Sequence, residues 1–380
     1  MSVRIHGWCP TARRPMASGD GLVVRLSPKT GRITPEQAVA IAAAAQTYGN
    51  ALIDLSGRAN VQLRGVDGQH HAALIADLMP LGLIEAATDG TAPSLRNIIV
   101  TPFADEATCA LAESLRLALA DAPELPDKFG FMLDCGQAPV MRDVSADIRL
   151  ERTVDGALIM RASGLDLGAL ITQAHAAEAM VDFAHWFVAA GGVCKGRGRM
   201  AQLIAQGARP QGALAATHAP APASARPKPG LVAQGALVAF EFGQLRGETL
   251  AALAALGSLR ITPWRMVLVE GLRQMPELQG LITDPDDPML RVFACTGAPG
   301  CLQGQAPVRA LARTLAPRLD PEMTLHVSGC AKGCAWPARA SLTLTATPQG
   351  FDLIHDGRAG DGAETRTLST QQIFDLSEFS

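Results

Sequence analysis

Four of the eight cysteines form two close pairs in the last quarter of the chain. Cys295 and Cys301 are separated by five residues in ACTGAPGCLQG, and Cys330 and Cys334 by three in VSGCAKGCAWP. The glycines beside these thiols allow backbone amides to approach the sulfurs and donate hydrogen bonds to them. The two pairs therefore predict one iron–sulfur site. A zinc site is the alternative, although it usually takes tighter C-x2-C or C-x4-C pairs.

The composition is that of an ordinary globular protein with more than one domain. A chain of 380 residues with 48% apolar side chains predicts two or three domains. The net charge of −3 produces no field that would attract nucleic acid or an anionic membrane. Apolar runs such as residues 38–45 are shorter than the roughly 20 residues of a membrane helix. With no secretion signal recognisable, we expect a cytoplasmic protein.

The remaining cysteines are scattered singly along the chain. In a reducing compartment, cysteines are better interpreted as free thiols or metal ligands than as disulfides. We therefore expect Cys9, Cys109, Cys135 and Cys194 to be buried and to behave as small apolar side chains.

Both halves of the chain begin with a strand, a helix and a returning strand, which predicts an internal repeat. The first copy has strands at 21–26, 51–55 and 60–63, and a helix from a capping box at Thr34 and Gln37 to about Tyr48. The second copy has strands at 236–242 and 259–269 around a helix at 247–256. Such a unit cannot cover its own sheet, so we expect the two copies to pack together around a cleft.

The rest of each half has the pattern of a mixed α/β lobe. Strands are expected at 129–133, at 148–161 around a turn, and as a hairpin at 341–347 and 350–355, with a helix at 172–190. Residues 217–230, THAPAPASARPKPG, form a Pro- and Ala-rich linker between the halves.

The cysteine pairs, the repeat and the segment DLSGRANVQLRGV together resemble the sulfite and nitrite reductase superfamily over nearly the whole chain. Within it, GAPGC, SGCAKGCAWP and LRITPWR are most similar to the precorrin-3B synthase family. The resemblance implies a [4Fe-4S] cluster on Cys295, Cys301, Cys330 and Cys334. It also implies oxygen-dependent hydroxylation of precorrin-3A, with lactone formation, in aerobic cobalamin biosynthesis.

The same resemblance implies an α+β fold of duplicated ferredoxin-like half-domains plus two α/β lobes of the nitrite/sulfite reductase type. The expected boundaries are 16–82 and 231–285 for the half-domains, 90–216 for the first lobe, 217–230 for the linker and 288–380 for the cluster-bearing lobe.

A precorrin carries many carboxylates, which arginine binds well through its bidentate fork. By resemblance, Arg58, Arg96 and Lys128 match basic residues of the superfamily, and Arg64 shares a strand face with Gln62. Each could instead be an ordinary surface or ion-paired group. Trp264 aligns with Arg58 in the second repeat, where it either covers a macrocycle edge or packs the repeats together.

The departures from the superfamily pattern decide between its activities. Asp127 and Gly130 replace two cations of the reductases around Lys128, which disfavours reduction of a small oxyanion. A sirohaem-dependent sulfite or nitrite reductase is the first alternative, and a non-catalytic iron–sulfur or zinc protein the second. No G-x-G-x-x-G follows a strand, so electrons must come from a separate donor using NADH or a ferredoxin. A second iron site is an open expectation, and its ligands do not follow from spacing.

Overall fold

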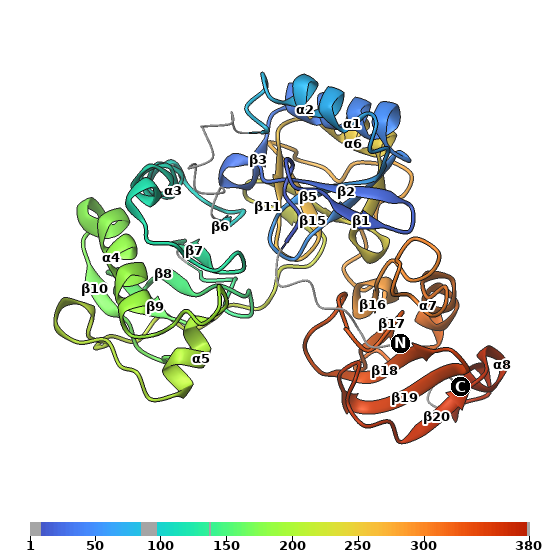
Figure 1. Ribbon diagram of the computed structural model, residues 1–380. Coiled ribbons are helices and arrows are strands. Elements are labelled where there is room, and N and C mark those ends of the chain that lie inside the picture. The colour runs from blue at the N-terminus through green and yellow to red at the C-terminus, as the bar shows by residue number, and fades with distance from the viewer. Residues whose placement is uncertain (1–8, 85–96, 137, 378–380) are drawn as a thin grey trace.

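The computed structural model describes residues 9–84, 97–136 and 138–377. Within them, the chain forms a central body and two flanking lobes (Figure 1). The central body combines the blue N-terminal segment with the gold segment that follows residue 230, and the lobes are green and orange to red. Each of the three bodies has its own hydrophobic core. The expected α+β fold is confirmed.

The central body contains two five-stranded sheets, and each borrows a strand from the other repeat. The first runs β1(Met16–Ser18), β2(Gly21–Leu26), β5(Val61–Val66), β4(Leu52–Leu55), β13(Gln244–Arg246). The second runs β11(Gly230–Val232), β12(Gly235–Ala239), β15(Met266–Glu270), β14(Leu259–Ile261), β3(Arg32–Ile33). The exchange of β3 and β13 covers the edge strands β14 and β4, and the two repeats therefore form one unit.

The helices of the two repeats pack against each other above these sheets (Figure 1). α1(Pro35–Tyr48) begins where predicted, because the Thr34 side chain accepts from the Gln37 amide, the Gln37 side chain accepts from the Thr34 amide, and Pro35 occupies the first helical position. α1 lies beside α6(Gly247–Ala254) and α2(His71–Leu78). Their buried faces join the sheets in one shared core.

The prediction of one strand over 259–269 is wrong. The segment forms a hairpin in which β14 ends at Ile261 and β15 begins at Met266. Thr262 makes the turn, because its hydroxyl accepts from the amides of Trp264 and Met266, and Arg265 adopts a left-handed conformation with φ of 62°.

The first lobe is a sheet in the order β10(Ala169–Ile171), β9(Leu158–Ala162), β8(Ile148–Arg152), β7(Gly130–Asp134), β6(Asn97–Val100). β6, β7 and β8 are parallel, and β9 and β10 are antiparallel additions. The lobe's helices are α3(Glu106–Ala118), α4(Ala176–Ala189) and α5(Met200–Ala205). The predicted strands and the long helix are confirmed, with bounds shifted by a few residues.

The C-terminal lobe repeats this topology. Its sheet runs β16(Val292–Ala294), β17(Leu325–Ser328), β18(Ala340–Thr347), β19(Gly350–Gly357), β20(Thr365–Leu368), again with three parallel strands followed by two antiparallel ones. Its helices are α7(Arg309–Leu315) and α8(Thr370–Phe374). The terminal hairpin is confirmed.

Short 3-10 turns connect several elements: η1(Lys29–Gly31), η2(Leu119–Asp121), η3(Gln173–His175), η4(Gly212–Leu214), η5(Glu241–Gly243), η6(Pro288–Arg291) and η7(Ala316–Arg318). Among the described residues, no helix has both the length and the apolar character needed to cross a bilayer.

Candidate active site

The four paired cysteines lie in two neighbouring loops of the C-terminal lobe. Cys295 and Cys301 follow β16, and Cys330 and Cys334 follow β17. Because β16 and β17 are adjacent and parallel, both loops leave the same edge of the sheet. The loops are also joined directly, because the Gly329 amide donates to the Cys295 sulfur at 3.2 Å and the Gln305 amide donates to the Gly329 carbonyl at 2.8 Å.

The two loops can approach closely because glycines, which have no side chain, lie where they meet. A Cβ at Gly329 would lie 3.0 Å from the Gly297 Cα and 3.3 Å from the Cys295 sulfur. An amide that donates to a thiolate sulfur is the contact by which proteins stabilise iron–sulfur clusters. The donor set and its glycine surroundings therefore fit a cluster of this kind.

The four thiols also interact electrostatically. Burial raises the pKa of the Cys330 and Cys334 thiols, and the nearby cysteines, Cys295 and Cys301 included, raise it further. No three His, Cys, Asp or Glu side chains within the described ranges converge closely enough to hold a single ion. A four-iron cluster is larger than a single ion and holds its ligand sulfurs further apart, so its four thiols need not converge on one point.

A cavity of about 710 Å³ lies beside these loops, where the central body, the first lobe and the C-terminal lobe meet. Cys295 and Cys334 form part of its wall. Six arginines also line it: Arg25, Arg58, Arg64, Arg226, Arg265 and Arg309. The carboxylates in the wall are those of Asp54 and Asp143, so positive charge dominates.

A polar row across the first sheet contributes Arg25, Asp54 and Gln62 to the cavity wall. Arg25, Gln62, Asp54 and Gln244 are register partners on β2, β5, β4 and β13. Gln244 donates to Asp54 at 2.7 Å, and Asp54 also faces Arg309 at 3.7 Å. Strand alternation places these side chains on one face. Asp54 thereby holds Arg309 against the cavity.

Arg58 lies in the turn between β4 and β5, as predicted, and its guanidinium enters the cavity wall. It donates to the Lys128 carbonyl at 2.9 Å. The pKa of the Arg58 guanidinium is lowered, chiefly by burial and next by the nearby charge of Arg199. Lys128 thus meets the site through its backbone. Arg96 lies outside the described residues.

Arg64 also lines the cavity, but its guanidinium is already bound. It donates to Asp20 through two nitrogens and to the carbonyl of Gly300 at 3.0 Å. The sequence could not show this, because Asp20 and Gly300 come from a different hairpin and a different lobe.

Trp264 packs the two repeats together, which is one of the two roles considered for it. It lines the cavity and packs in the shared core of the repeats, where 5% of it is exposed. Arg265 donates to the Ala335 carbonyl at 2.8 Å, which connects the second half-domain to the cysteine loop at 334. Phe293 and Trp336 stack with ring centroids 3.9 Å apart and provide a further aromatic wall.

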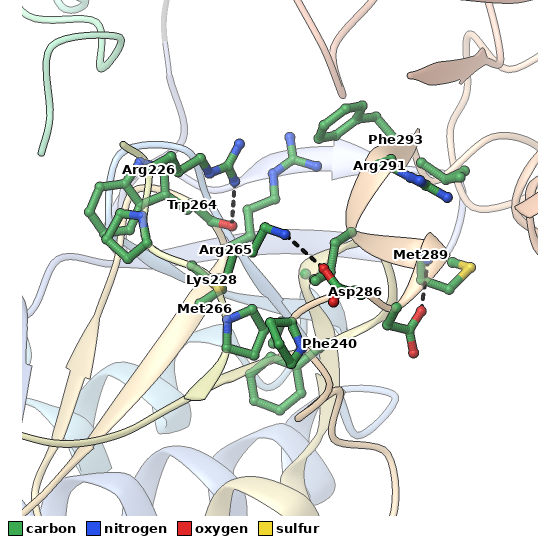
Figure 2. A pocket seen from close by; sticks show the side chains of 18 of the residues that line it. Arg226, Lys228, Phe240, Trp264, Arg265, Met266, Asp286, Met289, Arg291 and Phe293 are labelled. Carbon is green, nitrogen blue, oxygen red and sulfur yellow. Dashed lines mark hydrogen bonds and ion pairs between the residues drawn. The ribbon is translucent and has the colours of Figure 1, made fainter. Parts of the chain in front are cut away.

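A side chamber of about 540 Å³ adjoins the cavity (Figure 2). The two share five wall residues: Arg226, Phe242, Trp264, Arg265 and Phe293. Arg226 donates to the Trp264 carbonyl at 3.3 Å, and Lys228 pairs with Asp286 at 2.8 Å (Figure 2). The linker therefore contributes side chains to the site.

Three comparisons place this architecture among known proteins. Residues 14–81 match the model of the nitrite/sulfite reductase ferredoxin-like half domain. The structure of the Mycobacterium tuberculosis NirA protein superposes with a TM-score of 0.69 at 19% identity, over 94% of this chain and 79% of that one. A curated precorrin-3B synthase from Sinorhizobium sp. is 30% identical over 93% of this chain and 83% of its own length.

The chain belongs to the precorrin-3B synthase family. The nitrite/sulfite reductase fold expected from the cysteine and repeat motifs is confirmed. In this member of the precorrin-3B synthase family, the repeat carries Arg25 and Arg58 into the cavity and the C-terminal lobe carries the thiols.

Sequence reasoning missed four of the cavity arginines. Arg25 had a detectable signal, because it lies on the predicted strand 21–26 and could pair across to Gln62. Arg265 directly follows Trp264 in LRITPWR, but the motif gives no sign that its side chain reaches the site. Arg226 and Arg309 had no sequence signal. Arg226 lies in the linker and Arg309 at the start of a short helix, and both segments reach the cavity only through the tertiary fold.

The single cysteines only partly follow the prediction. Cys135 is buried, whereas Cys9 and Cys109 are half-buried and Cys194 is exposed. Cys9 lines the main cavity. The prediction that Cys9, Cys109 and Cys194 are buried was wrong, because the segments that carry them lie at the protein surface or at a cavity wall.

Proposed function

We propose that this protein catalyses the oxygen-dependent hydroxylation of precorrin-3A, with lactone formation, to give precorrin-3B. The single observation that carries the proposal is one cavity of about 710 Å³ that combines six guanidiniums with two of the paired cysteines. A guanidinium fork binds carboxylates bidentately, so a polycarboxylate macrocycle matches this wall. Membership of the precorrin-3B synthase family supports the same assignment.

In this proposal Arg25, Arg58 and Arg309 bind peripheral carboxylates, and Trp264 and Trp336 contact the apolar edge of the macrocycle. Asp54 orients Arg309, and the Lys128 carbonyl orients Arg58. Positive charge fixed before binding costs no reorganisation when the substrate arrives. Together these residues hold the ring in one orientation.

Cys295, Cys301, Cys330 and Cys334 would hold a [4Fe-4S] cluster, which when bound supplies electrons one at a time. The overall reaction takes one oxygen atom into the product and releases the other as water, and therefore needs two electrons from outside the chain. A separate donor, either an NADH-dependent reductase or a ferredoxin, provides them. A second iron site beside the macrocycle belongs to the same proposal.

The test starts with anaerobic purification and assays of iron and acid-labile sulfide, for which we expect about four sulfides per chain and about four irons, or about five when the second iron site is filled. The protein is then incubated with precorrin-3A and a reductant, with and without 18O-labelled dioxygen. We expect a product heavier by one labelled oxygen atom, formed only with dioxygen. An intact, reducible cluster with no change in substrate mass would overturn the proposal.

The nitrite/sulfite reductase fold favours one competing function, a sirohaem-dependent sulfite or nitrite reductase. Asp127 and Gly130 weigh against it, because Gly130 begins the buried strand β7 and Asp127 faces Arg14 at 3.9 Å, so neither supplies a cation. Visible absorption separates the two. A Soret band with a sirohaem-like red band supports the reductase, and a broad brown shoulder supports the hydroxylase.

A further inference from the structure

One backbone carbonyl in the first cysteine loop accepts three hydrogen bonds from the first half-domain. The Gly300 oxygen receives the Ser18 hydroxyl at 2.6 Å, the Gly19 amide at 3.2 Å and the Arg64 guanidinium at 3.0 Å. Gly300 precedes Cys301 directly, whereas the donors lie more than 230 residues earlier in the sequence. The β1–β2 hairpin and Arg64 of β5 therefore hold the loop by hydrogen bonds, at the residue before a proposed cluster ligand.

The contact is too close for side chains. A Cβ at Gly19 would lie 1.9 Å from the Pro299 carbonyl oxygen, and real Cβ atoms essentially never come that near. The two backbones therefore touch directly. A contact of this kind transmits a displacement of the hairpin to the loop, because no flexible side chain lies between them.

Arg64 is itself immobilised. Its Nε and Nη2 atoms donate to the two carboxylate oxygens of Asp20 at 3.1 and 2.8 Å, and 7% of the residue is exposed. Asn50 donates to the same carboxylate at 3.2 Å, and Asp54 lies 3.7 Å from Nε. A bidentate arginine–carboxylate pair is both strong and geometrically restrictive. Arg64 is thus held in the orientation that serves Gly300.

We propose that Arg64 is a positioning residue for the loop Cys295–Cys301 rather than a ligand for substrate carboxylates. Through the pair of Arg64 with Asp20, the first half-domain helps to position the loop that carries two of the proposed cluster ligands. The cluster itself rests on the proposed function, but the grip on the loop is a property of the protein alone. It can therefore be tested in protein with and without iron.

The first experiment uses iron-free, full-length protein and follows alkylation of Cys301 by iodoacetamide with peptide mass spectrometry. Cys194, which is exposed in the other lobe, is the internal reference. We expect Arg64→Gln and Asp20→Asn each to accelerate Cys301 alkylation about tenfold, the factor for loss of one net charge-assisted contact. Because the two residues form one pair, the double variant should be no faster than the faster single variant.

Arg25→Gln is the matched control, because Arg25 lines the same cavity from the same sheet and pairs in register with Gln62. It should leave Cys301 alkylation unchanged. Arg64→Lys keeps the charge but loses the bidentate guanidinium, so its rate of Cys301 alkylation should lie between those of wild type and Arg64→Gln. Ser18→Ala, a milder change, tests the same carbonyl if Arg64→Gln does not fold.

The second experiment follows iron release to a chelator from protein reconstituted anaerobically. Arg64→Gln should lose iron about tenfold faster than wild type, and Arg25→Gln at the wild-type rate. Unchanged Cys301 alkylation in folded Arg64→Gln overturns the positioning role, as does equal acceleration by Arg25→Gln. Wild-type protein that binds no iron overturns the proposed cluster instead, and leaves the alkylation result to decide the positioning role.

Discussion

The two lobes share one topology and differ in the residues at the ends of their parallel strands. In the C-terminal lobe, Cys295 comes directly after β16, and Cys330 comes two residues after β17. In the first lobe, Thr101 comes directly after β6 and Cys135 directly after β7. Burial raises the pKa of the Cys135 thiol to about 12, and its sulfur lies against the Leu150 carbonyl at 3.6 Å. This thiol is a packed side chain, whereas the paired thiols form a potential ligand set.

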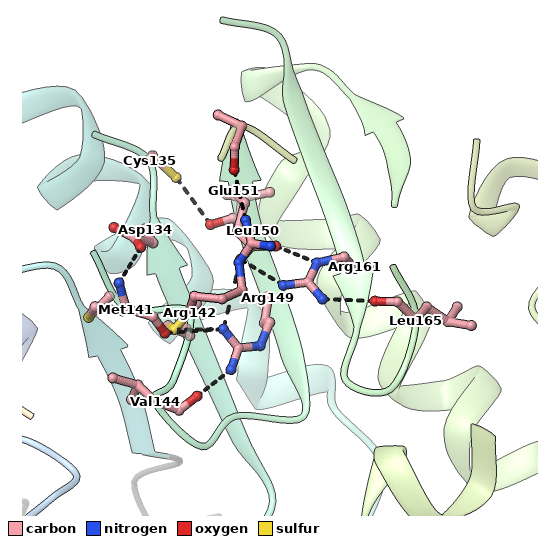
Figure 3. Close-up of polar contacts among 12 residues, drawn as sticks. Asp134, Cys135, Met141, Arg142, Val144, Arg149, Leu150, Glu151, Arg161 and Leu165 are labelled. Carbon is pink, nitrogen blue, oxygen red and sulfur yellow. Dashed lines mark hydrogen bonds and ion pairs between the residues drawn. The ribbon is translucent and has the colours of Figure 1, made fainter. Parts of the chain in front are cut away.

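The first lobe instead encloses charge. Glu151, 1% exposed, binds Arg161 through both oxygens at 2.6 and 2.8 Å, and Arg142 and Arg149 lie within 4 Å of it (Figure 3). Arg149 also donates to the carbonyls of Met141 and Val144, which fastens the loop after β7. In the described part of the C-terminal lobe, the buried polar side chains are His326, Ser328, Thr343 and Thr345.

The comparison shows that one scaffold carries paired thiols in its loops in one lobe and a buried charge network on its strands in the other. His326 agrees with this division, because burial lowers its pKa to about 4 and keeps it neutral. Within the part of the C-terminal lobe that the structure describes, no fully buried side chain therefore carries a fixed charge. Four predictions break or sharpen the contrast.

The largest expected difference is in iron binding. Cys301→Ser should abolish acid-labile sulfide and the iron of the cluster, because three thiolates cannot complete a four-cysteine site. Cys135→Ser, the matched change in the first lobe, should retain them. Iron and sulfide assays after anaerobic purification measure both. Full iron content in Cys301→Ser would remove the basis for treating the two lobes as different.

The second difference is in stability. Glu151→Gln should lower the free energy of unfolding by about 3–5 kcal/mol, because it leaves buried guanidiniums without their counter-charge. Urea denaturation measures the loss. The control is Glu241→Gln, whose pair with Arg313 is about half exposed and should contribute less than about 1 kcal/mol. Equal losses in the two variants would contradict a special role for the buried network.

The third difference is in pH dependence. Asp134 ends β7 where Ser328 ends β17, and burial raises the Asp134 pKa from 3.8 to about 6. The native state therefore keeps a proton that the unfolded chain releases near pH 4. Stability should fall as the pH rises from about 4 to about 6, by at most ~3 kcal/mol, and then level off.

Asp134→Asn should remove this part of the pH dependence, because the amide cannot ionise and can still accept from the Met141 amide. Unfolding free energies at pH 4, 5, 6 and 7 provide the measurement. Parallel pH profiles for wild type and variant would show that Asp134 titrates normally.

The smallest effect concerns the linker between the lobes. Arg226→Gln should weaken binding of uroporphyrin, an eight-carboxylate probe, about tenfold, and should weaken its octamethyl ester little, because the ester offers no charge to a guanidinium. Quenching of tryptophan fluorescence reports binding, since Trp264 and Trp336 line the cavity. Arg273→Gln, an exposed arginine near Ala233, is the control. Equal affinities of wild type and Arg226→Gln for uroporphyrin would show that the linker does not contribute to binding.

Much of the local structure could be predicted from the sequence. The capping box at Thr34 places the start of α1, and period-two alternation marks the hairpin of β18 and β19. The prediction failed at residues 259–269, where a Thr262 side-chain turn interrupts an apolar run. Apolar patterning does not report a turn made by a hydroxyl, so the two strands were joined into one.

The sequence by itself determined which chemistry this protein can carry. The thiol pairs, their glycines and the arginine after β4 are each defined by residue types and spacing within a short stretch of sequence. The tertiary structure alone decided where that chemistry is assembled. The exchange of β3 and β13, the grip on Gly300 and the arrival of Arg226 and Arg309 at one cavity all join residues far apart along the chain. Contacts of that kind depend on how whole sheets pack, and no short window of sequence contains that information.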